Sequence, residues 1–119
     1  MFLSAAVCLF LKNTDLFAVE KYNVVDGDSL RFEKVEIRLI DIDAPEFFQK
    51  CYNKNNEQYE CGKIATRVLE NYVKNGIQCR GKEKDVYNRI LMECFDNDGN
   101  SINKKMIFDG WAVTYSDRF

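Results

Sequence analysis

The sequence predicts a mostly β fold with helices, in the α+β class, and three observations support this prediction. Short segments that alternate apolar and polar residues lie between turn residues in both halves of the chain. One apolar pattern with helical spacing occupies residues 61–73, and a shorter one follows residue 101. The 119 residues, 46% of them hydrophobic, are enough for one domain with a modest core.

The first half of the chain is predicted to contain three strands. Residues 19–25 form the first strand, and the Asp-Gly-Asp-Ser stretch at residues 26–29 forms a turn, because Gly and Asp tolerate the backbone angles of turns. Residues 30–32 and 35–40 alternate apolar and polar side chains, which predicts a hairpin around residues 33–34.

A polar loop and a helix are predicted next. Pro45 ends the hairpin because proline cannot continue a central strand, and residues 47–57 form a loop rich in Asn and Lys. Apolar residues then recur at helical spacing over residues 61–73, and Asn75-Gly76 provides a stop. We expect an amphipathic helix of about four turns there.

The second half is predicted to add a strand pair, at residues 77–79 and 90–95. Ser101 is a candidate N-cap for a short helix that ends at Gly110, and residues 111–115 form a last extended segment. Five strands with the amphipathic helix after the third and a short C-terminal helix predict a small closed barrel of the OB type.

The Asp-Asn-Asp-Gly-Asn stretch at residues 96–100 resembles the start of an EF-hand loop. Its glycine comes two positions early, and no bidentate Glu follows at the required distance. We interpret this stretch as a hairpin-type turn and not as a calcium loop.

The N-terminus is predicted to be a targeting segment. Residues 1–11 form an apolar run that is too short to span a membrane, and the Leu-Phe-Ala stretch at residues 16–18 is a candidate cleavage site. We expect residues 1–18 to be a signal peptide or N-terminal anchor, and residues 19–119 to be the functional domain. The alternative is an apolar strand or helix packed on that domain.

Five cysteines agree with export. Cys8 lies in the apolar run, and the four others allow three disulfide pairings. We expect Cys51–Cys61 to close the polar loop and Cys79–Cys94 to join two strands. A zinc site and four buried free thiols are the alternatives, although no C-x-x-C pair is present.

Charge and composition exclude several functions. Seventeen basic and nineteen acidic residues give a net charge of -2, so phosphate binding needs a local cluster or a metal. The chain has no histidine, which removes Ser-His triads and most zinc sites.

The acidic residues are densest between positions 26 and 46, and two arginines are candidate partners for a phosphate. This acidic group consists of Asp26, Asp28, Asp41, Asp43 and Glu46. Its oxygens suit a hard cation such as Ca²⁺, although ordinary turn aspartates are the alternative. Arg38 and Arg89 could clamp a phosphodiester, although surface salt bridges are the alternative for each.

Four stretches resemble the ordered signatures of the thermonuclease, or staphylococcal-nuclease-like, family. These stretches are Val25-Asp26-Gly27-Asp28-Ser29, Arg38-Leu39-Ile40-Asp41-Ile42-Asp43-Ala44-Pro45-Glu46, Asp85-Val86-Tyr87-Asn88-Arg89 and Gly110-Trp111-Ala112. The resemblance covers residues 19–115 and is specific because several motifs occur in the right order. The long loop with cysteines at both ends is similar to exported bacterial members.

The resemblance implies a role for each matched position. Asp28, Asp43 and the backbone carbonyl of Ala44 would bind Ca²⁺. The catalytic residues would be Arg38, Glu46 and Arg89, with Glu46 as general base and the arginines on the phosphate. Tyr87 would contact a substrate phosphate, and Tyr115 is a candidate for stacking on a base. Asp26 and Asp41 would support the site.

The family further implies a calcium-dependent nuclease that hydrolyses DNA and RNA with little sequence preference and leaves 3′-phosphates. We expect a secreted or periplasmic monomer without a stable protein partner, or one anchored to a membrane through residues 1–18. The alternatives are a non-catalytic OB-type nucleic-acid-binding module and an extracellular interaction domain.

Overall fold

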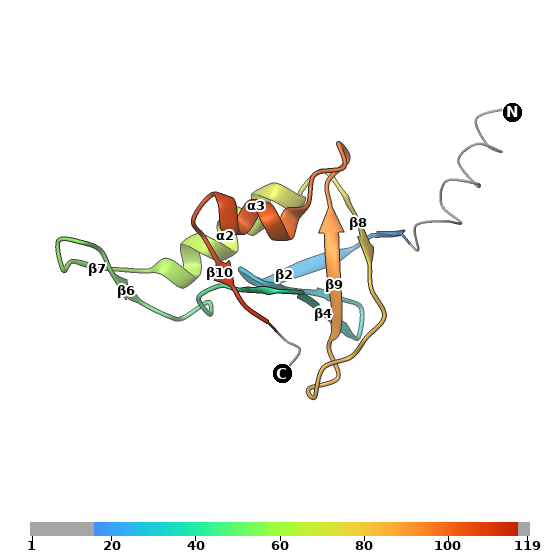
Figure 1. The fold of residues 1–119 in the computed structure, drawn as a ribbon, viewed down its shortest axis with the longest axis horizontal. Helices are drawn as coiled ribbons and strands as arrows, with labels where there is room; N and C mark the ends of the chain where they lie inside the picture. Colours follow the sequence, from blue (N-terminus) through green and yellow to red (C-terminus); the bar gives the residue numbers. More distant parts are fainter. Residues whose placement is uncertain (1–15, 117–119) are drawn as a thin grey trace, which may run out of the picture.

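The computed structural model describes residues 16–116, which form a mostly β fold with two helices (Figure 1). The helices are α2 (Cys61–Val73) and α3 (Ile102–Phe108). The strands are β1 (Phe17–Val19), β2 (Tyr22–Asp26), β3 (Ser29–Phe32), β4 (Val35–Leu39), β5 (Ile42–Asp43), β6 (Cys51–Tyr52), β7 (Gln58–Tyr59), β8 (Ile77–Arg80), β9 (Ile90–Phe95) and β10 (Val113–Thr114).

Six strands form one sheet in the order β1-β8-β9-β4-β3-β2. Its neighbouring strands are antiparallel except for β4 and β9, which are parallel. The strands β1 and β2 stand at opposite ends of this order, yet only Glu20 and Lys21 separate them in the chain. The two edges must therefore lie close together, because two residues span only about 10 Å from one strand end to the next. This curled sheet confirms the predicted OB-type fold.

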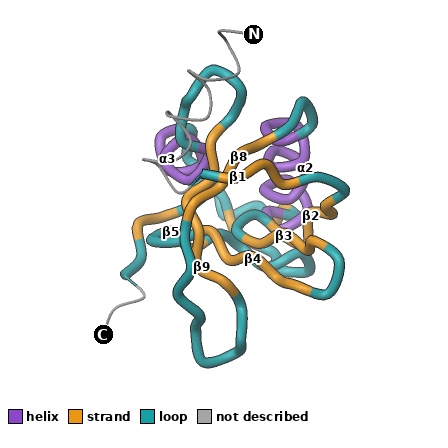
Figure 2. Tube along the Cα trace, turned by 90° about the vertical axis from the view of Figure 1, so that its right-hand side faces the viewer, coloured by secondary structure: helices purple, strands orange, loops and turns teal. Residues whose placement is uncertain are grey.

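The core lies between the curled sheet and the helices. Figures 1 and 2 show both helices at one end of the sheet, whereas the loop between β8 and β9 extends from the other end. The helix α2 buries one face, from Ala65 through Leu69 to Val73, as its helical spacing predicts. The side chains with almost no exposed surface include Leu30, Leu39, Ile42, Leu69, Met92, Ile102 and Met106.

Most predicted elements are confirmed, and two differ. The hairpin over residues 29–39, the helix α2, the β8–β9 pair and the helix α3 all form, and Ser101 caps α3 by accepting a hydrogen bond from the Lys104 N–H. The strand predicted over residues 19–25 is instead split, because Lys21 has a φ of 55°. The loop predicted over residues 47–57 contains the short hairpin β6–β7.

Both expected disulfides form. Cys79 and Cys94 are directly opposite each other on β8 and β9, with their Cα atoms 4.0 Å apart. Cys51 and Cys61 join β6 to the start of α2, with their Cα atoms 5.6 Å apart. With all four cysteines in disulfides, zinc binding by these sulfurs and the free-thiol alternative are excluded.

The predicted N-terminal segment is only partly visible. Residues 1–15 lie outside the described residues, and Phe17–Val19 forms β1, which pairs with β8. Cleavage after Ala18 would therefore remove two of the three residues of β1. No helix in the described part of the chain is long and apolar enough to cross a membrane.

Candidate active site

The tight turn between β2 and β3 positions Asp28. The Asp26 carboxylate closes this turn, because its Oδ1 accepts hydrogen bonds from the Asp28 N–H at 3.2 Å and the Ser29 hydroxyl at 2.8 Å. A Cβ at Gly27 would come within 2.7 Å of the Ala44 Cβ and 2.9 Å of the Ala65 Cβ. Glycine therefore allows the turn to pack directly against Ala44, the residue after β5, and against α2.

Four of the predicted site residues meet at this corner. Asp28 Oδ2 accepts a hydrogen bond from the Ala44 N–H at 2.8 Å and lies 3.4 Å from Arg38 Nη1. The other terminal nitrogen of Arg38, Nη2, lies 4.0 Å from Asp43 Oδ1. One guanidinium group thus faces two carboxylates, one from the turn between β2 and β3 and one from β5.

Burial makes this group electrostatically unusual. Asp28 and Arg38 are each only 6% exposed, whereas the Asp43 side chain is 57% exposed. Burial and then the nearby Asp26 raise the pKa of Asp28 to about 7, although the Ala44 N–H and Arg38 oppose this shift. The ionised form of Asp28 therefore has less compensating charge than a carboxylate this deeply buried requires.

Arg89 lies on a neighbouring strand and faces the same side. It precedes β9, which runs parallel to β4, and its Nη1 lies 3.8 Å from Glu36 Oε2. Glu36 and Arg38 share one face of β4 because side chains alternate along a strand. Asp85 holds Arg89 in place, since Asp85 Oδ2 accepts from Arg89 Nε at 2.7 Å and Oδ1 from the Arg89 N–H at 2.9 Å.

Each of the two arginines has a tyrosine beside it. The guanidinium carbon of Arg38 lies 5.9 Å from the centre of the Tyr115 ring, and that of Arg89 lies 5.3 Å from the Tyr87 ring. Tyr87 is 75% exposed and Tyr115 is 47% exposed, so both rings have free surface beside a positive charge.

Glu46 is held through its backbone, and its carboxylate is free. Its carbonyl accepts a hydrogen bond from the Gln49 N–H at 2.9 Å, and its N–H donates to Gln49 Oε1 at 3.3 Å. Glu46 is exposed, and its carboxylate has no hydrogen-bond or ion-pair partner among residues 16–116. Glu46 follows Asp43 by three residues in the sequence, and among the described residues no hydrogen bond or ion pair joins its carboxylate to Asp28 or Arg38.

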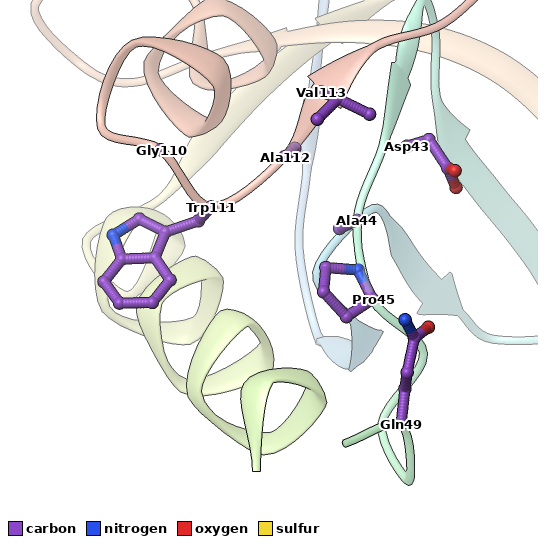
Figure 3. Close-up of a pocket in the computed structure, with 8 residues that line it drawn as sticks. All are labelled: Asp43, Ala44, Pro45, Gln49, Gly110, Trp111, Ala112 and Val113. Atoms are coloured by element: carbon purple, nitrogen blue, oxygen red, sulfur yellow. The ribbon is translucent and has the colours of Figure 1, made fainter. Parts of the chain in front are cut away.

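A pocket of about 260 Å³ adjoins this corner (Figure 3). The segment from Asp43 to Pro45 and the segment from Gly110 to Val113 line it side by side, because β5 and β10 pair there. Gln49 completes the lining. The sequence did not predict Gln49, Glu36 or Asp85 as site residues. For Glu36 a usable signal existed, since strand alternation places it beside Arg38.

The possible metal ligands at this corner are oxygens, which suit a hard cation. The chain has no histidine and all four described cysteines form disulfides, so Asp28 and Asp43 can offer a metal only carboxylate oxygens, which here face the Ala44 N–H and Arg38. Within the described range, no three His, Cys, Asp or Glu side chains group closely enough to hold a metal. Two carboxylates and the Ala44 carbonyl would leave a hard cation several places for water or phosphate oxygens.

The fold and the site together define a class of protein. OB-type barrels bind oligonucleotides and oligosaccharides on one side of the sheet. Here one face of the sheet carries two arginines, and guanidinium groups recognise phosphate through paired hydrogen bonds. The chain is thus a small OB-type protein with two arginines on one face of its sheet.

The particular family follows from comparison with known proteins. The staphylococcal nuclease homologue family matches residues 36–118, which is most of the chain, and the chain belongs to this family. The match includes β4, the acidic corner after it, Arg89 and the segment that forms β10.

Three curated relatives are each 29% identical to this chain. The succinoglycan biosynthesis protein ExoI of Rhizobium meliloti (strain 1021) matches 93% of this chain and 61% of its own length. The endonuclease YhcR of Bacillus subtilis (strain 168) matches 77% of this chain and 8% of its own length. An uncharacterized endonuclease of Escherichia coli matches 77% of this chain and 57% of its own length. The chain therefore spans less than two-thirds of each of these relatives. Two of them are named as endonucleases, and the third is named for polysaccharide synthesis.

Proposed function

We propose that this protein is a calcium-dependent nuclease that hydrolyses phosphodiester bonds in DNA and RNA and leaves 3′-phosphate ends. The observation that carries this proposal is the buried Arg38 guanidinium, which lies 3.4 Å from Asp28 and 4.0 Å from Asp43. Family membership and two relatives named as endonucleases support the same activity.

The acidic corner would bind the metal. Asp28, Asp43 and the Ala44 carbonyl are the residues that would hold Ca²⁺, with Asp28 already fixed by the Ala44 N–H. When bound, Ca²⁺ neutralises negative charge on the phosphoryl group and polarises it.

The two arginines would bind the phosphate from the strand side. Arg38 is rigid because it is buried and paired, and Arg89 is rigid because Asp85 holds it through both backbone and side chain. Donors that are already oriented stabilise the charge that builds up on a five-coordinate phosphorus without rearranging during the reaction.

Glu46 would act on the attacking water. Its carboxylate is exposed and has no competing partner within the described residues, so it is free to orient a water molecule and accept its proton. In-line attack from that side would expel the 5′-oxygen. Tyr87 would contact a substrate phosphate and Tyr115 a base or sugar, and contacts of this type discriminate little between sequences.

We further propose that the protein is exported and acts as a monomer, with an anchor in residues 1–18 as the alternative to cleavage. Two disulfides among the described residues support an oxidising compartment.

Digestion of plasmid DNA in Ca²⁺ and in chelator tests the activity. We expect the wild type to cut only with Ca²⁺. Glu46→Gln and Arg89→Ala should each reduce cleavage about a hundredfold or more, as expected for the loss of a general base or of a charge-stabilising donor. Both variants should keep the far-ultraviolet circular dichroism of the wild type.

Matched controls are available on the same fold. Glu70 is an exposed residue of α2, and Arg80 pairs with Glu93 across β8 and β9 at 3.1 Å. We expect Glu70→Gln and Arg80→Ala to cut at the wild-type rate. If Glu46→Gln or Arg89→Ala also cut at that rate, the roles assigned to these residues are wrong.

A further inference from the structure

The segment from Phe47 to Glu60, here named the arm, extends away from the barrel. Figure 1 shows its hairpin β6–β7 as the part of the described chain farthest from the curled sheet on the side of α2. Phe48 is 84% exposed and Tyr52 is 64% exposed, although aromatic rings are among the side chains that folding most strongly buries. A group of exposed aromatic side chains on a soluble domain usually marks a binding surface.

The arm is an ordered element and not a loose loop. The Cys51–Cys61 disulfide and the hydrogen bond from the Gly62 N–H to the Gln49 carbonyl fix its base. The Asn53 side chain closes its tip, because its oxygen accepts from the N–H groups of Asn55 and Glu57, each at 2.9 Å. A surface that is ordered before binding loses less conformational entropy when a ligand binds.

The ring of Phe48 has a packing partner on one side. Phe47 packs against it edge to face, with ring centres 4.9 Å apart, and Lys63 lies 6.0 Å from the Phe47 ring. Phe48 thus presents a ring that is braced on one side and open to solvent.

The charges on the arm indicate which class of ligand it would bind. Glu57 is engaged by Asn53, and Glu60 by Lys63 at 3.1 Å. Lys50 and Lys54 form no ion pair within the described part of the chain, although the charge of Lys50, after that of Lys63, helps to lower the pKa of Glu60. Lysines that alternate with exposed aromatic rings suit the binding of single-stranded nucleic acid, because the rings can stack on bases and the lysines can contact phosphates.

The arm is also continuous with the proposed site. It begins directly after Glu46, and Gln49 lines the pocket beside Asp43. A strand bound at the proposed site would therefore lie next to the base of the arm.

We propose that the arm is a subsite for single-stranded nucleic acid, in which Phe48 and Tyr52 stack on bases beyond the scissile phosphate and Lys50 and Lys54 contact the intervening phosphates. This inference rests on the proposed nuclease function and extends it. It means that the enzyme prefers substrates long enough to reach the arm.

The test compares two substrates in the same assay. One is a dinucleotide whose single phosphodiester bond is the bond to be cleaved, and the other is a long single-stranded oligonucleotide. Phe48→Ala and Tyr52→Ala should each raise KM for the oligonucleotide about tenfold, as expected for the loss of one stacked base. Cleavage of the dinucleotide should not change. The control is Phe108→Ala, because Phe108 is 89% exposed at the end of α3 and should affect neither substrate.

A second measurement does not depend on cleavage. Binding of a labelled oligonucleotide to the Glu46→Gln protein is followed by fluorescence anisotropy over a range of salt concentrations. Replacing Lys50 or Lys54 with Gln in that background should reduce the slope of log affinity against log salt by about 0.7, as for one phosphate contact with a single strand. Lys34→Gln, in the turn between β3 and β4, should leave the slope unchanged.

The outcomes separate this inference from the proposed function. Equal KM values for wild type and arm variants, or an equal loss on both substrates, would overturn the subsite. Binding to lipid vesicles that depends on Phe48, with no effect on oligonucleotide binding, would assign the arm to a membrane and also overturn it. If the wild type cuts neither substrate, the nuclease proposal fails, while the anisotropy measurement still tests the arm.

Discussion

Asp28 shows most clearly how single residues shape this site. Asp28 is only 6% exposed, and a carboxylate buried to this extent needs a positively charged partner. Arg38 at 3.4 Å compensates for only part of the cost of burying the charge, because the pKa of Asp28 is still raised to about 7. Asp26 contributes to this rise from the neighbouring turn position. A second positive charge at this corner would relieve the imbalance, and a hard divalent cation is the ligand whose chemistry fits.

Asp28→Asn should therefore remove the effect of calcium on stability. We expect the thermal midpoint of the wild type to rise with Ca²⁺, since an ion at a hundred times its Kd adds about 2.7 kcal/mol to the free energy of unfolding. The variant should show no rise. The control is Asp98→Asn in the turn that resembles an EF-hand loop, and this variant should respond like the wild type. If Asp98→Asn abolishes the rise and Asp28→Asn does not, the metal site has been assigned to the wrong turn.

Asp85 controls a second residue of the site, and its role depends on pH. Burial tends to raise the pKa of Asp85, but hydrogen bonds from the Arg89 backbone and side chain outweigh it and lower the pKa below its ordinary value. A lowered pKa means that the ionised carboxylate stabilises the fold above its unfolded pKa of about 3.9. This stabilisation is lost as the pH falls through the folded pKa.

The pH prediction is measured with Asp85→Asn, which keeps an oxygen for the backbone donors and loses the charge. At pH 7 we expect the variant to be less stable than the wild type by about 1 kcal/mol in urea unfolding, because solvent screening at this partly exposed pair reduces the value of a charged hydrogen bond. The difference should begin to shrink as the pH falls below about 3.9 and should disappear once the pH is below the folded pKa of Asp85. A difference that stays constant from pH 7 to pH 3 would show that the Asp85 charge does not contribute.

At the scale of elements, α2 holds the segment that carries Glu46. A Cβ at Gly62 would come within 1.7 Å of the Glu46 carbonyl oxygen and 2.7 Å of the Phe47 carbonyl oxygen, and backbone atoms cannot move aside as a flexible side chain can. The first turn of α2 and the turn after Pro45 are therefore packed backbone against backbone. Cys61 beside Gly62 adds the disulfide to Cys51 at the same place.

Gly62→Ala should displace Glu46 without touching any proposed catalytic side chain. We expect a loss of about 3 kcal/mol in the free energy of unfolding, the upper range for overpacking, and a fall in kcat larger than any change in KM. Leu69→Ala is the control, because it removes a buried side chain from α2 seven residues further on and should destabilise the fold by a similar amount. If Gly62→Ala had wild-type kcat, the position of Glu46 would not matter for the reaction.

The elements also show what sequence reasoning can and cannot provide. The helix α2 was predictable because a 13-residue amphipathic pattern is long enough to have a clear period. The hairpin β6–β7 was not, since its strands have two residues each and carry no period. The meeting of Asp28 with the Ala44 N–H joins residues 16 apart, and only the family motifs indicated it. Asp85 and Arg89 are four residues apart across one turn, and this spacing could have indicated that they form hydrogen bonds.

At the scale of the whole molecule, closure of the sheet depends on a single short connection. The order β1-β8-β9-β4-β3-β2 brings both edges to Glu20 and Lys21, and Lys21 makes the bend with a φ of 55°. β1 is thus the strand that covers the free edge of β8. Val19 is only 3% exposed, so this strand also contributes to the core.

Removing β1 stepwise should open the barrel stepwise. Against a chain that starts at residue 16, a chain that starts at residue 19 loses the pairing of Phe17 and Ala18 with β8 and should be less stable by about 2 kcal/mol, two net hydrogen bonds. A chain that starts at residue 20 also loses the buried Val19 and should lose about 2 kcal/mol more. Urea unfolding of the three chains measures both steps. Equal stability of the first two chains would mean that β1 contributes nothing there, so that cleavage after Ala18 would cost the fold nothing. A clear first step would instead favour a mature protein that retains Phe17.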